Sequence, residues 1–240
     1  MKVINLISGP RNLSTALMYS FAQREDMIVM DEPFYGYYLK NADLKNAHPS
    51  QEEILEIMEV RENKIIETIN QNSLHKNVFV KGMAHHLLNE SPLFILDWDN
   101  VLLIRHPKKL IASFSKVISN PDLTDIGIKK ESELFLFLQK NGKTPLVIDS
   151  DELLKNPKAY LITICEHLDI PFDEKMLVWQ KGGIPEDGIW AKHWYRNVHN
   201  SEGFAVQKSS SQALAPHLEP LLKAALPFYD ILKSSILKNE

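Results

Sequence analysis

The chain contains a single cysteine, Cys165, so no disulfide can form within it. Cys165 lies in the apolar-periodic stretch 161–168, where we expect a buried and unreactive thiol. No apolar run approaches the length of a membrane-spanning helix, and the first ten residues are interrupted too soon for a secretory signal. We therefore expect a cytoplasmic protein with no membrane partner.

An excess of positive charge is also missing. The formal net charge is -4, the isoelectric point is about 6.1, and no basic block stands out. A nucleic-acid partner is therefore not expected, whereas a small anionic ligand needs only a few local cations. The 240 residues are 44% hydrophobic and predict one domain over 1–240; the oligomeric state stays open.

Short β-branched runs alternate with longer helical patterns, which predicts an α/β fold with a mostly parallel central sheet flanked by helices. A capping box at Ser50 and Glu53 predicts the start of a helix that carries Ile54, Met58, Ile65 and Ile69 on one face. The expected strands are 3–7, 28–30, 78–80, 101–104 and 146–148, and further helices are expected after residue 13 and around 134–138, 159–168 and 214–225.

The first strand runs into a loop, residues 9–15, and then into a helix, an arrangement that aims backbone N–H groups at an anion. A Walker A loop would need a Gly-Lys pair, but Gly9 is followed by Pro-Arg-Asn-Leu-Ser-Thr. The missing lysine disfavours ordinary ATP or GTP use. A Ser/Thr-capped helix after a turn is the alternative interpretation.

A second anion motif follows the strand at 101–104. Arg105 stands at the carboxyl end of this strand, where it faces the ligand crevice of an open α/β sheet and can grip a phosphate at two points. Pro107 suits the first turn of the next helix, and Ser113 lies on that helix. The alternatives are a surface ion pair for Arg105 and a solvated position for Ser113.

Residues 10–15 resemble the 5′-phosphosulfate loop of sulfotransferases, commonly Pro-Lys/Arg-Ser-Gly-Thr/Ser-Thr, although Asn12-Leu13 replaces the usual Ser-Gly. Residues 102–113 are similar to the family's 3′-phosphate motif, strand-Arg-x-Pro-x5-Ser, and 147–172 resembles the segment after its last core strand. The resemblance implies a P-loop fold that binds 3′-phosphoadenosine 5′-phosphosulfate (PAPS). It further implies transfer of the sulfuryl group to a hydroxyl or amine of a small-molecule acceptor, with PAP as product and no metal required.

The same resemblance implies the site residues. Lys81 ends a strand as the lysine of the family's Lys-Thr-His motif does, and we expect it near the bridging oxygen of the donor. Met83 stands where the family has its general base, so His85 and Glu32 are rival candidates for that role. The expected cofactor-binding residues are Arg11, Asn12, Leu13, Ser14, Thr15, Arg105 and Ser113, with Lys181 and Gly182 from a weaker match at 180–182.

Two alternative functions stay open. The first is a P-loop nucleotide kinase or NTPase, in which residues 93–97 would form a Walker B strand. The second is a binding protein that retains the PAPS scaffold without catalysis, because the Lys-x-His base is absent. The acceptor is not named by the sequence: aromatic residues at 34–38, at Trp98 and within 188–195 suit either a pocket or a core.

Overall fold

A central parallel sheet organises the molecule. The computed structural model describes residues 1–44, 48–118, 120–205 and 214–238. Five strands pair in the order β2-β3-β1-β4-β5, and each pairing is parallel. The predicted α/β fold is therefore confirmed, with every predicted strand present and extended by one to four residues. The strands are β1 (Val3–Ser8), β2 (Met27–Asp31), β3 (Asn77–Met83), β4 (Asp99–Ile104) and β5 (Leu146–Asp149).

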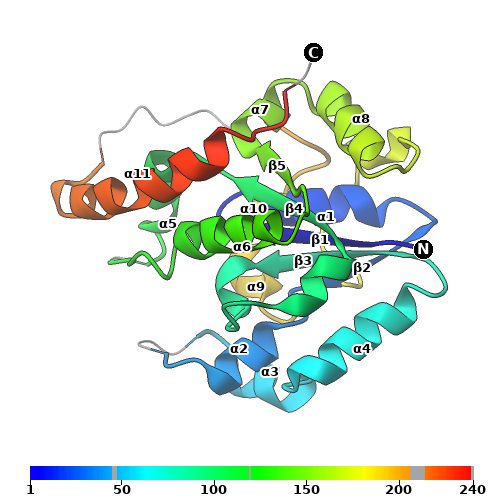
Figure 1. The fold of residues 1–240 in the computed structure, drawn as a ribbon, viewed down its shortest axis with the longest axis horizontal. Coiled ribbons are helices and arrows are strands. Elements are labelled where there is room, and N and C mark those ends of the chain that lie inside the picture. The colour runs from blue at the N-terminus through cyan, green and yellow to red at the C-terminus, as the bar shows by residue number, and fades with distance from the viewer. Residues whose placement is uncertain (45–47, 119, 206–213, 239–240) are drawn as a thin grey trace.

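Helices cover both faces of this sheet (Figure 1). Side chains alternate along β1, so Ile4 and Leu6 join the core on one face and Val3 and Ile7 join the core on the other. The first core is closed mainly by α1 (Ser14–Ala22), α2 (Tyr35–Asn41), α7 (Ser150–Lys155) and α8 (Pro157–His167). The second is closed by α4 (Glu62–Asn72), α5 (Pro107–Phe114), α6 (Ile128–Lys140) and α11 (Glu219–Lys233), of which α11 packs along α5 and α6.

The helix predicted from the capping box at Ser50 is wrong in two respects. The segment forms two helices, α3 (Gln51–Ile57) and α4, because the chain turns extended at Met58. Ser50 adopts a left-handed conformation with φ 58° and makes no capping hydrogen bond. The break permits a close helix contact, since a Cβ on Gly36 of α2 would lie 2.8 Å from the Cβ of Met58.

Residues 93–97 are not a strand. They form the short 3-10 helix η2 (Leu93–Asp97), which leads into β4. An apolar run of five residues does not distinguish a strand from a helical turn by its pattern, and Pro92 precedes this one. The Walker B strand that the kinase alternative needs at this position is therefore absent.

The carboxyl ends of the strands gather the candidate site residues at one edge of the sheet. Ser8 pairs in register with Met83 on one side and with Leu103 on the other, and Asp31 pairs with Lys81. The loops after β1, β2, β3 and β4 therefore leave the sheet together. Within the described part of the chain, no helix has both the length and the apolar character to cross a bilayer.

Candidate active site

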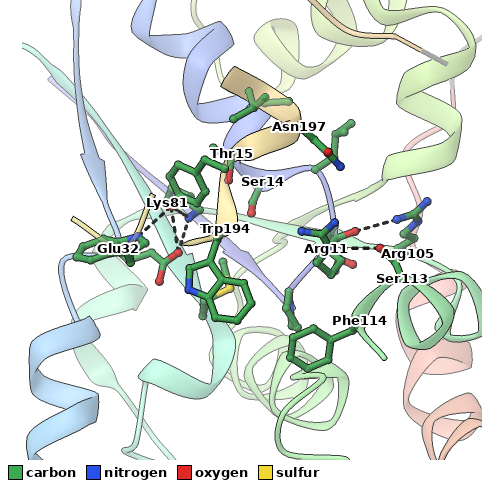
Figure 2. A pocket seen from close by; sticks show the side chains of 18 of the residues that line it. Arg11, Ser14, Thr15, Glu32, Lys81, Arg105, Ser113, Phe114, Trp194 and Asn197 are labelled. Carbon is green, nitrogen blue, oxygen red and sulfur yellow. Dashed lines mark hydrogen bonds and ion pairs between the residues drawn. The ribbon is translucent and has the colours of Figure 1, made fainter. Parts of the chain in front are cut away.

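A cavity of about 520 Å³ opens at this edge of the sheet. The loop after β1 forms one wall, and the segment that carries α9 (Ala191–Trp194) and α10 (Arg196–His199) covers it. Figure 2 shows its side chains, with Lys81 and Glu32 on one side and Arg11, Arg105 and Ser113 on the other. Ser14, Thr15 and Trp194 lie between these two groups.

The loop at 9–15 is held in a strained conformation. Arg11 and Leu13 both have positive φ, 61° and 74°, and Leu13 stands where the resembling motif has glycine, the residue that adopts this region most easily. Leu13 is the residue that precedes α1, and no side chain caps this helix. The positive end of α1 is thus available to an anion, and the alternative of a Ser/Thr-capped helix does not hold.

Two contacts fix the loop from behind. The side-chain amide of Asn12 is fully buried and donates to the carbonyl of Leu103 on β4 over 2.9 Å. At Gly9 the loop lies against the turn before α6, because an added Cβ would be only 2.4 Å from the carbonyl oxygen of Ile126. The loop is therefore pinned to the sheet on one side and to the helical layer on the other.

Two arginines lie beside the loop. Arg105 donates from Nη1 to the carbonyl oxygen of Arg11 over 3.0 Å, and Arg11 donates from Nε to Oγ of Ser113 over 3.2 Å (Figure 2). Burial, followed by the positive charge of Arg105, lowers the pKa of Arg11. Placing two guanidinium groups this close costs free energy that an anion between them would recover.

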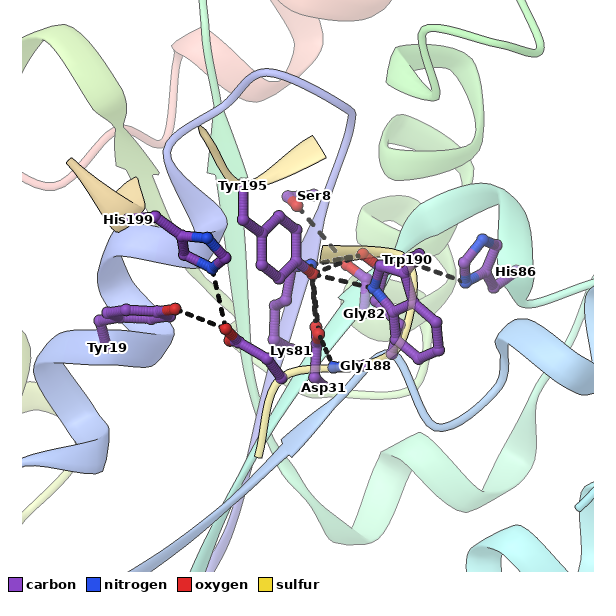
Figure 3. A network of polar contacts seen from close by, with 12 residues as sticks. Ser8, Tyr19, Asp31, Lys81, Gly82, His86, Gly188, Trp190, Tyr195 and His199 are labelled. Atoms are coloured by element: carbon purple, nitrogen blue, oxygen red, sulfur yellow. Dashed lines mark hydrogen bonds and ion pairs between the residues drawn. The ribbon is translucent and has the colours of Figure 1, made fainter. Parts of the chain in front are cut away.

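On the other side of the cavity, Lys81 is buried in a polar cluster. Its Nζ donates to Oδ1 of Asp31 over 3.0 Å and to the hydroxyl of Tyr195 (Figure 3). It also donates to Glu32 (Figure 2). Burial disfavours the charge on Lys81, but the charges of Asp31 and Glu32 more than offset this and raise its pKa. Lys81 therefore stays protonated although only 1% of its side chain is exposed.

Glu32 is positioned by its backbone as well as by its ion pair. It adopts a left-handed conformation with φ 47°, and its N–H donates to the carbonyl of Lys81 over 2.7 Å. Burial raises the pKa of the Glu32 carboxyl, with a further increase from Asp31, while Lys81 opposes the rise. A carboxylate whose pKa is raised above its usual range is a stronger base than an exposed glutamate.

The rival base, His85, lies in η1 (Ala84–His86) and also lines the cavity. Burial lowers the pKa of His85 to about 4, so its imidazole is neutral but only weakly basic. The neighbouring His86 stacks against Tyr35, and its Nδ1 lies 3.9 Å from Oε2 of Glu32. Of the two candidates, Glu32 thus has both the direct contact with Lys81 and the stronger basicity.

The comparison with known families decides what this site belongs to. A family model described as a sulfotransferase domain matches residues 1–236. The chain belongs to the sulfotransferase domain family. Two solved sulfotransferase structures share the fold of this sulfotransferase domain. The sulfotransferase domain from the curacin biosynthetic pathway has a TM-score of 0.52 and 16% identity, covering 94% of this chain and 97% of its own. The sulfotransferase from Alicyclobacillus acidocaldarius has a TM-score of 0.55 and 10% identity, covering 98% and 95%.

Two relatives of the sulfotransferase domain carry a different name. Branched-chain-amino-acid aminotransferase-like proteins 1 and 2 of Arabidopsis thaliana are 37% and 36% identical to it over 98% and 100% of this chain. The chain spans only 42% and 44% of their lengths. Their name describes proteins more than twice as long, so it is not carried over to the sulfotransferase domain.

Most residues that the sequence proposed for the sulfotransferase site line the one cavity. The exceptions are Lys181 and Gly182, which are not among the described residues that line it. Lys181 is exposed and pairs with Glu202 over 3.4 Å, and the N–H of Gly182 donates to the carbonyl of His199 over 2.8 Å. The residues that line the cavity as expected are Arg11, Asn12, Leu13, Ser14, Thr15, Glu32, Lys81, His85, Arg105 and Ser113.

Sequence reasoning missed two members of the polar cluster. Asp31 was not a candidate, and Tyr195 belonged to the aromatic-rich segment 188–195. The hydroxyl of Tyr195 accepts from Lys81 and from Nε1 of Trp190 (3.0 Å), and Asp31 accepts the N–H of Gly188 over 3.0 Å. Their separation from Lys81, by 50 and 114 positions, hides the contacts from any local pattern. A polar residue directly after a buried strand was the only sequence feature that pointed to Asp31.

Proposed function

We propose that the protein is a PAPS-dependent sulfotransferase that acts on a hydroxyl of a small-molecule acceptor. One observation supports this most: a single cavity contains the uncapped end of α1, the neighbouring Arg11 and Arg105, and the buried pair of Lys81 and Glu32. The first three form an anion site, and the pair forms a proton-accepting site. Sulfuryl transfer needs both within reach of one donor and one acceptor.

The residues of the loop fit the phosphate groups of such a donor. The N-terminus of α1 and Arg11 would hold the 5′-phosphosulfate, and Arg105 with Ser113 would hold the 3′-phosphate. PAPS supplies a sulfuryl group whose bond to the 5′-phosphate oxygen breaks as a bond to the acceptor oxygen forms, leaving PAP. Lys81 would stabilise negative charge that develops on the bridging oxygen.

Glu32 is the proposed general base. It would accept the proton of the acceptor hydroxyl, while Lys81 holds the carboxylate in position. His85 stays a candidate with the weaker argument, because a pKa of about 4 leaves it little tendency to take a proton. We propose the same residues for an amine acceptor, whose proton would leave by the same route.

The donor is tested by thermal stabilisation of the purified protein. PAP without magnesium should raise the melting temperature by several degrees at about a hundredfold excess over its dissociation constant, a gain of about 2.7 kcal/mol. ATP lacks the 3′-phosphate and should stabilise less at equal concentration. Strong protection by magnesium-ATP with none by PAP would contradict the proposal and favour a kinase.

Catalysis is tested separately from binding. We expect consumption of PAPS when a library of hydroxyl and amine compounds is screened, with PAP formed in equal amount. Binding of PAP without turnover of any acceptor would instead favour the second candidate, a PAP-binding protein on a sulfotransferase scaffold.

A further inference from the structure

His86 is a buried histidine whose side chain lies next to the proposed base. It ends η1, only 2% of it is exposed, and its Nδ1 has no hydrogen-bond partner among the residues that the structure describes. Oε2 of Glu32 lies 3.9 Å from this nitrogen (Figure 3). Buried polar atoms without a partner are rare in folded proteins, and a catalytic role is one of the reasons for which they occur.

Two tyrosines of α2 stack on the ring of His86. The ring centroids lie 4.7 Å apart for Tyr35, with the planes 6° from parallel, and 4.8 Å apart for Tyr38, with the planes 28° from parallel. Tyr35 is itself held, because a hydrogen bond joins its hydroxyl to Nδ1 of His48 over 2.8 Å. The stacks fix the plane of the His86 imidazole, so the edge of the ring, rather than its faces, is left to interact with other groups.

The two carboxylate oxygens of Glu32 have different neighbours. Oε1 pairs with the ammonium of Lys81, whereas Oε2 lies on the side of His86. In the proposed reaction Lys81 also stabilises the bridging oxygen of the donor, and an ammonium that moves toward this oxygen weakens its pair with Glu32. A hydrogen-bond donor at Oε2 would then keep the carboxylate in place.

His86 can donate such a hydrogen bond without adding a charge. Burial lowers its pKa well below the usual range, and the positive charges of His85, Lys81 and His48 would lower it further. The imidazole is therefore neutral at neutral pH, and the carboxylate beside Nδ1 favours the tautomer with the proton on this nitrogen. The titratable groups that face the ring are His85 on η1, Lys81 on β3, Glu32 after β2, Tyr35 and Tyr38 on α2, and His48.

We propose that His86 is a positioning residue for the general base: its neutral imidazole donates from Nδ1 to Oε2 of Glu32 and holds the carboxylate during the reaction. The acceptor proton passes to Oε2 as the acceptor oxygen bonds to the sulfuryl sulfur, and His86 keeps its own proton. The gap of 3.9 Å must close by about 1 Å, as catalytic hydrogen bonds often do when substrates bind. This inference rests on the proposed function for the role of Glu32.

The tautomer of His86 is measured without turnover. Long-range 1H–15N NMR spectra of the histidine-labelled protein, with and without PAP, show which ring nitrogen carries the proton, and the His86→Phe spectrum identifies the signal. We expect the proton on Nδ1 at neutral pH. A proton on Nε2 would overturn the proposal, because Nδ1 could then not donate to Glu32.

Two substitutions of His86 separate hydrogen bonding from stacking. His86→Phe keeps a ring against Tyr35 and Tyr38 but cannot donate, whereas His86→Asn keeps an N–H near the position of Nδ1 and loses the stack. We expect His86→Phe to lower kcat about tenfold with the KM for PAPS within about twofold, and His86→Asn to stay within about threefold of the wild-type kcat.

The acidic limb of the kcat profile gives a second comparison. It should move to higher pH in His86→Phe, because the charged form of Glu32 loses a donor and its pKa rises further. His167→Phe, which removes an exposed imidazole from α8, is the control and should leave kcat and the limb unchanged. A wild-type kcat and limb in His86→Phe would overturn the proposal, and so would a folded His86→Asn that is slower than His86→Phe.

Failure of this inference is distinguishable from failure of the proposed function. Titration of the Glu32 carboxyl by 13C NMR needs no acceptor, and it should give a higher pKa in His86→Phe than in the wild type. This shift in a protein that sulfates no acceptor would support the contact and contradict the proposed function. Turnover of PAPS with the same Glu32 pKa in both proteins would overturn the inference alone.

Discussion

The hydroxyl oxygen of Tyr195 lies 2.8 Å from each carboxylate oxygen of Asp31. The same oxygen accepts hydrogen bonds from Lys81 and from Trp190, which occupy its two lone pairs. The one hydroxyl proton of Tyr195 is therefore donated to Asp31. The contact ties the segment that covers the cavity to the end of β2 (Figure 3). The position of the Lys81 ammonium therefore depends on a residue far along the chain.

Replacing Tyr195 by phenylalanine should destabilise the fold by about 2 kcal/mol, since two buried donors lose their acceptor and Asp31 loses a donor. Chemical denaturation measures this change. Turnover should fall about tenfold or more, because the substitution displaces Lys81. PAP affinity should change little, because the loop at 9–15 stays in place. Tyr37→Phe on α2 serves as the control and should change stability by less than about 0.5 kcal/mol.

Glu32→Gln should lower kcat by about a hundredfold or more while PAP affinity stays within about twofold. His85→Gln should lower kcat by less than about tenfold. Single-turnover kinetics and calorimetric titration with PAP separate the two effects. A near-wild-type rate in Glu32→Gln together with a large loss in His85→Gln would reverse the assignment.

The pH dependence of turnover offers an independent check on Glu32. Because burial and Asp31 raise the pKa of this carboxyl, kcat should fall as the pH is lowered through a value above the usual 4.5 for glutamate. The acidic limb should disappear from the residual activity of Glu32→Gln. An acidic limb near pH 4 that survives in this variant would favour His85 instead.

Arg105→Ala should weaken PAP binding by about 1.5–3 kcal/mol, the range for a charge-assisted hydrogen bond. Part of this loss would come from the contact of Arg105 with the carbonyl of Arg11, which helps to hold the loop. Calorimetric titration checks the affinity. Lys108→Ala, an exposed position of α5, should bind PAP as the wild type does, and an Arg105→Ala protein with equal affinity would remove Arg105 from the site.

Glu131 of α6 is fully buried, and burial raises its pKa well above the usual range. The folded state therefore retains a proton that the unfolded state loses, so stability should decrease as the pH rises above about 4.5, by up to about 1.4 kcal/mol per pH unit. Glu131→Gln, a neutral isostere, should reduce this slope. Denaturation at pH 5, 6.5 and 8 measures it, with the exposed Glu133→Gln as control.

The sheet was predictable because its strands contain short apolar runs with β-branched residues, and most of these residues are buried. The ends of the strands were harder to predict. Strand β3 continues through Lys81 to Met83, and neither Lys81 nor Gly82 fits a β-branched pattern. The break between α3 and α4 was not predictable, since no proline or glycine marks Met58 and the apolar period continues across it. Contact with Gly36 of α2, a tertiary effect, accompanies the break.

The residues around the loop at 9–15 follow from local sequence, because they occur in two compact motifs around Arg11 and Arg105. The residues on the other side of the cavity do not. Asp125 lies in a turn without a recognisable motif, and its relation to Tyr38 arises only when α2 and the turn before α6 meet at the cavity. Burial, which makes His85 a weak base and Glu32 a stronger one, is likewise a property of the folded chain.

The contact of Gly9 with Ile126 packs the loop after β1 directly against the turn before α6. A Cβ on Gly127 would lie 3.3 Å from the Cα of Gly9, so two bare backbones touch where the donor loop meets the turn that follows Asp125. Backbone segments packed this closely transmit strain to one another. We therefore expect a shift of the loop at Gly9 to move the backbone next to Asp125 as well.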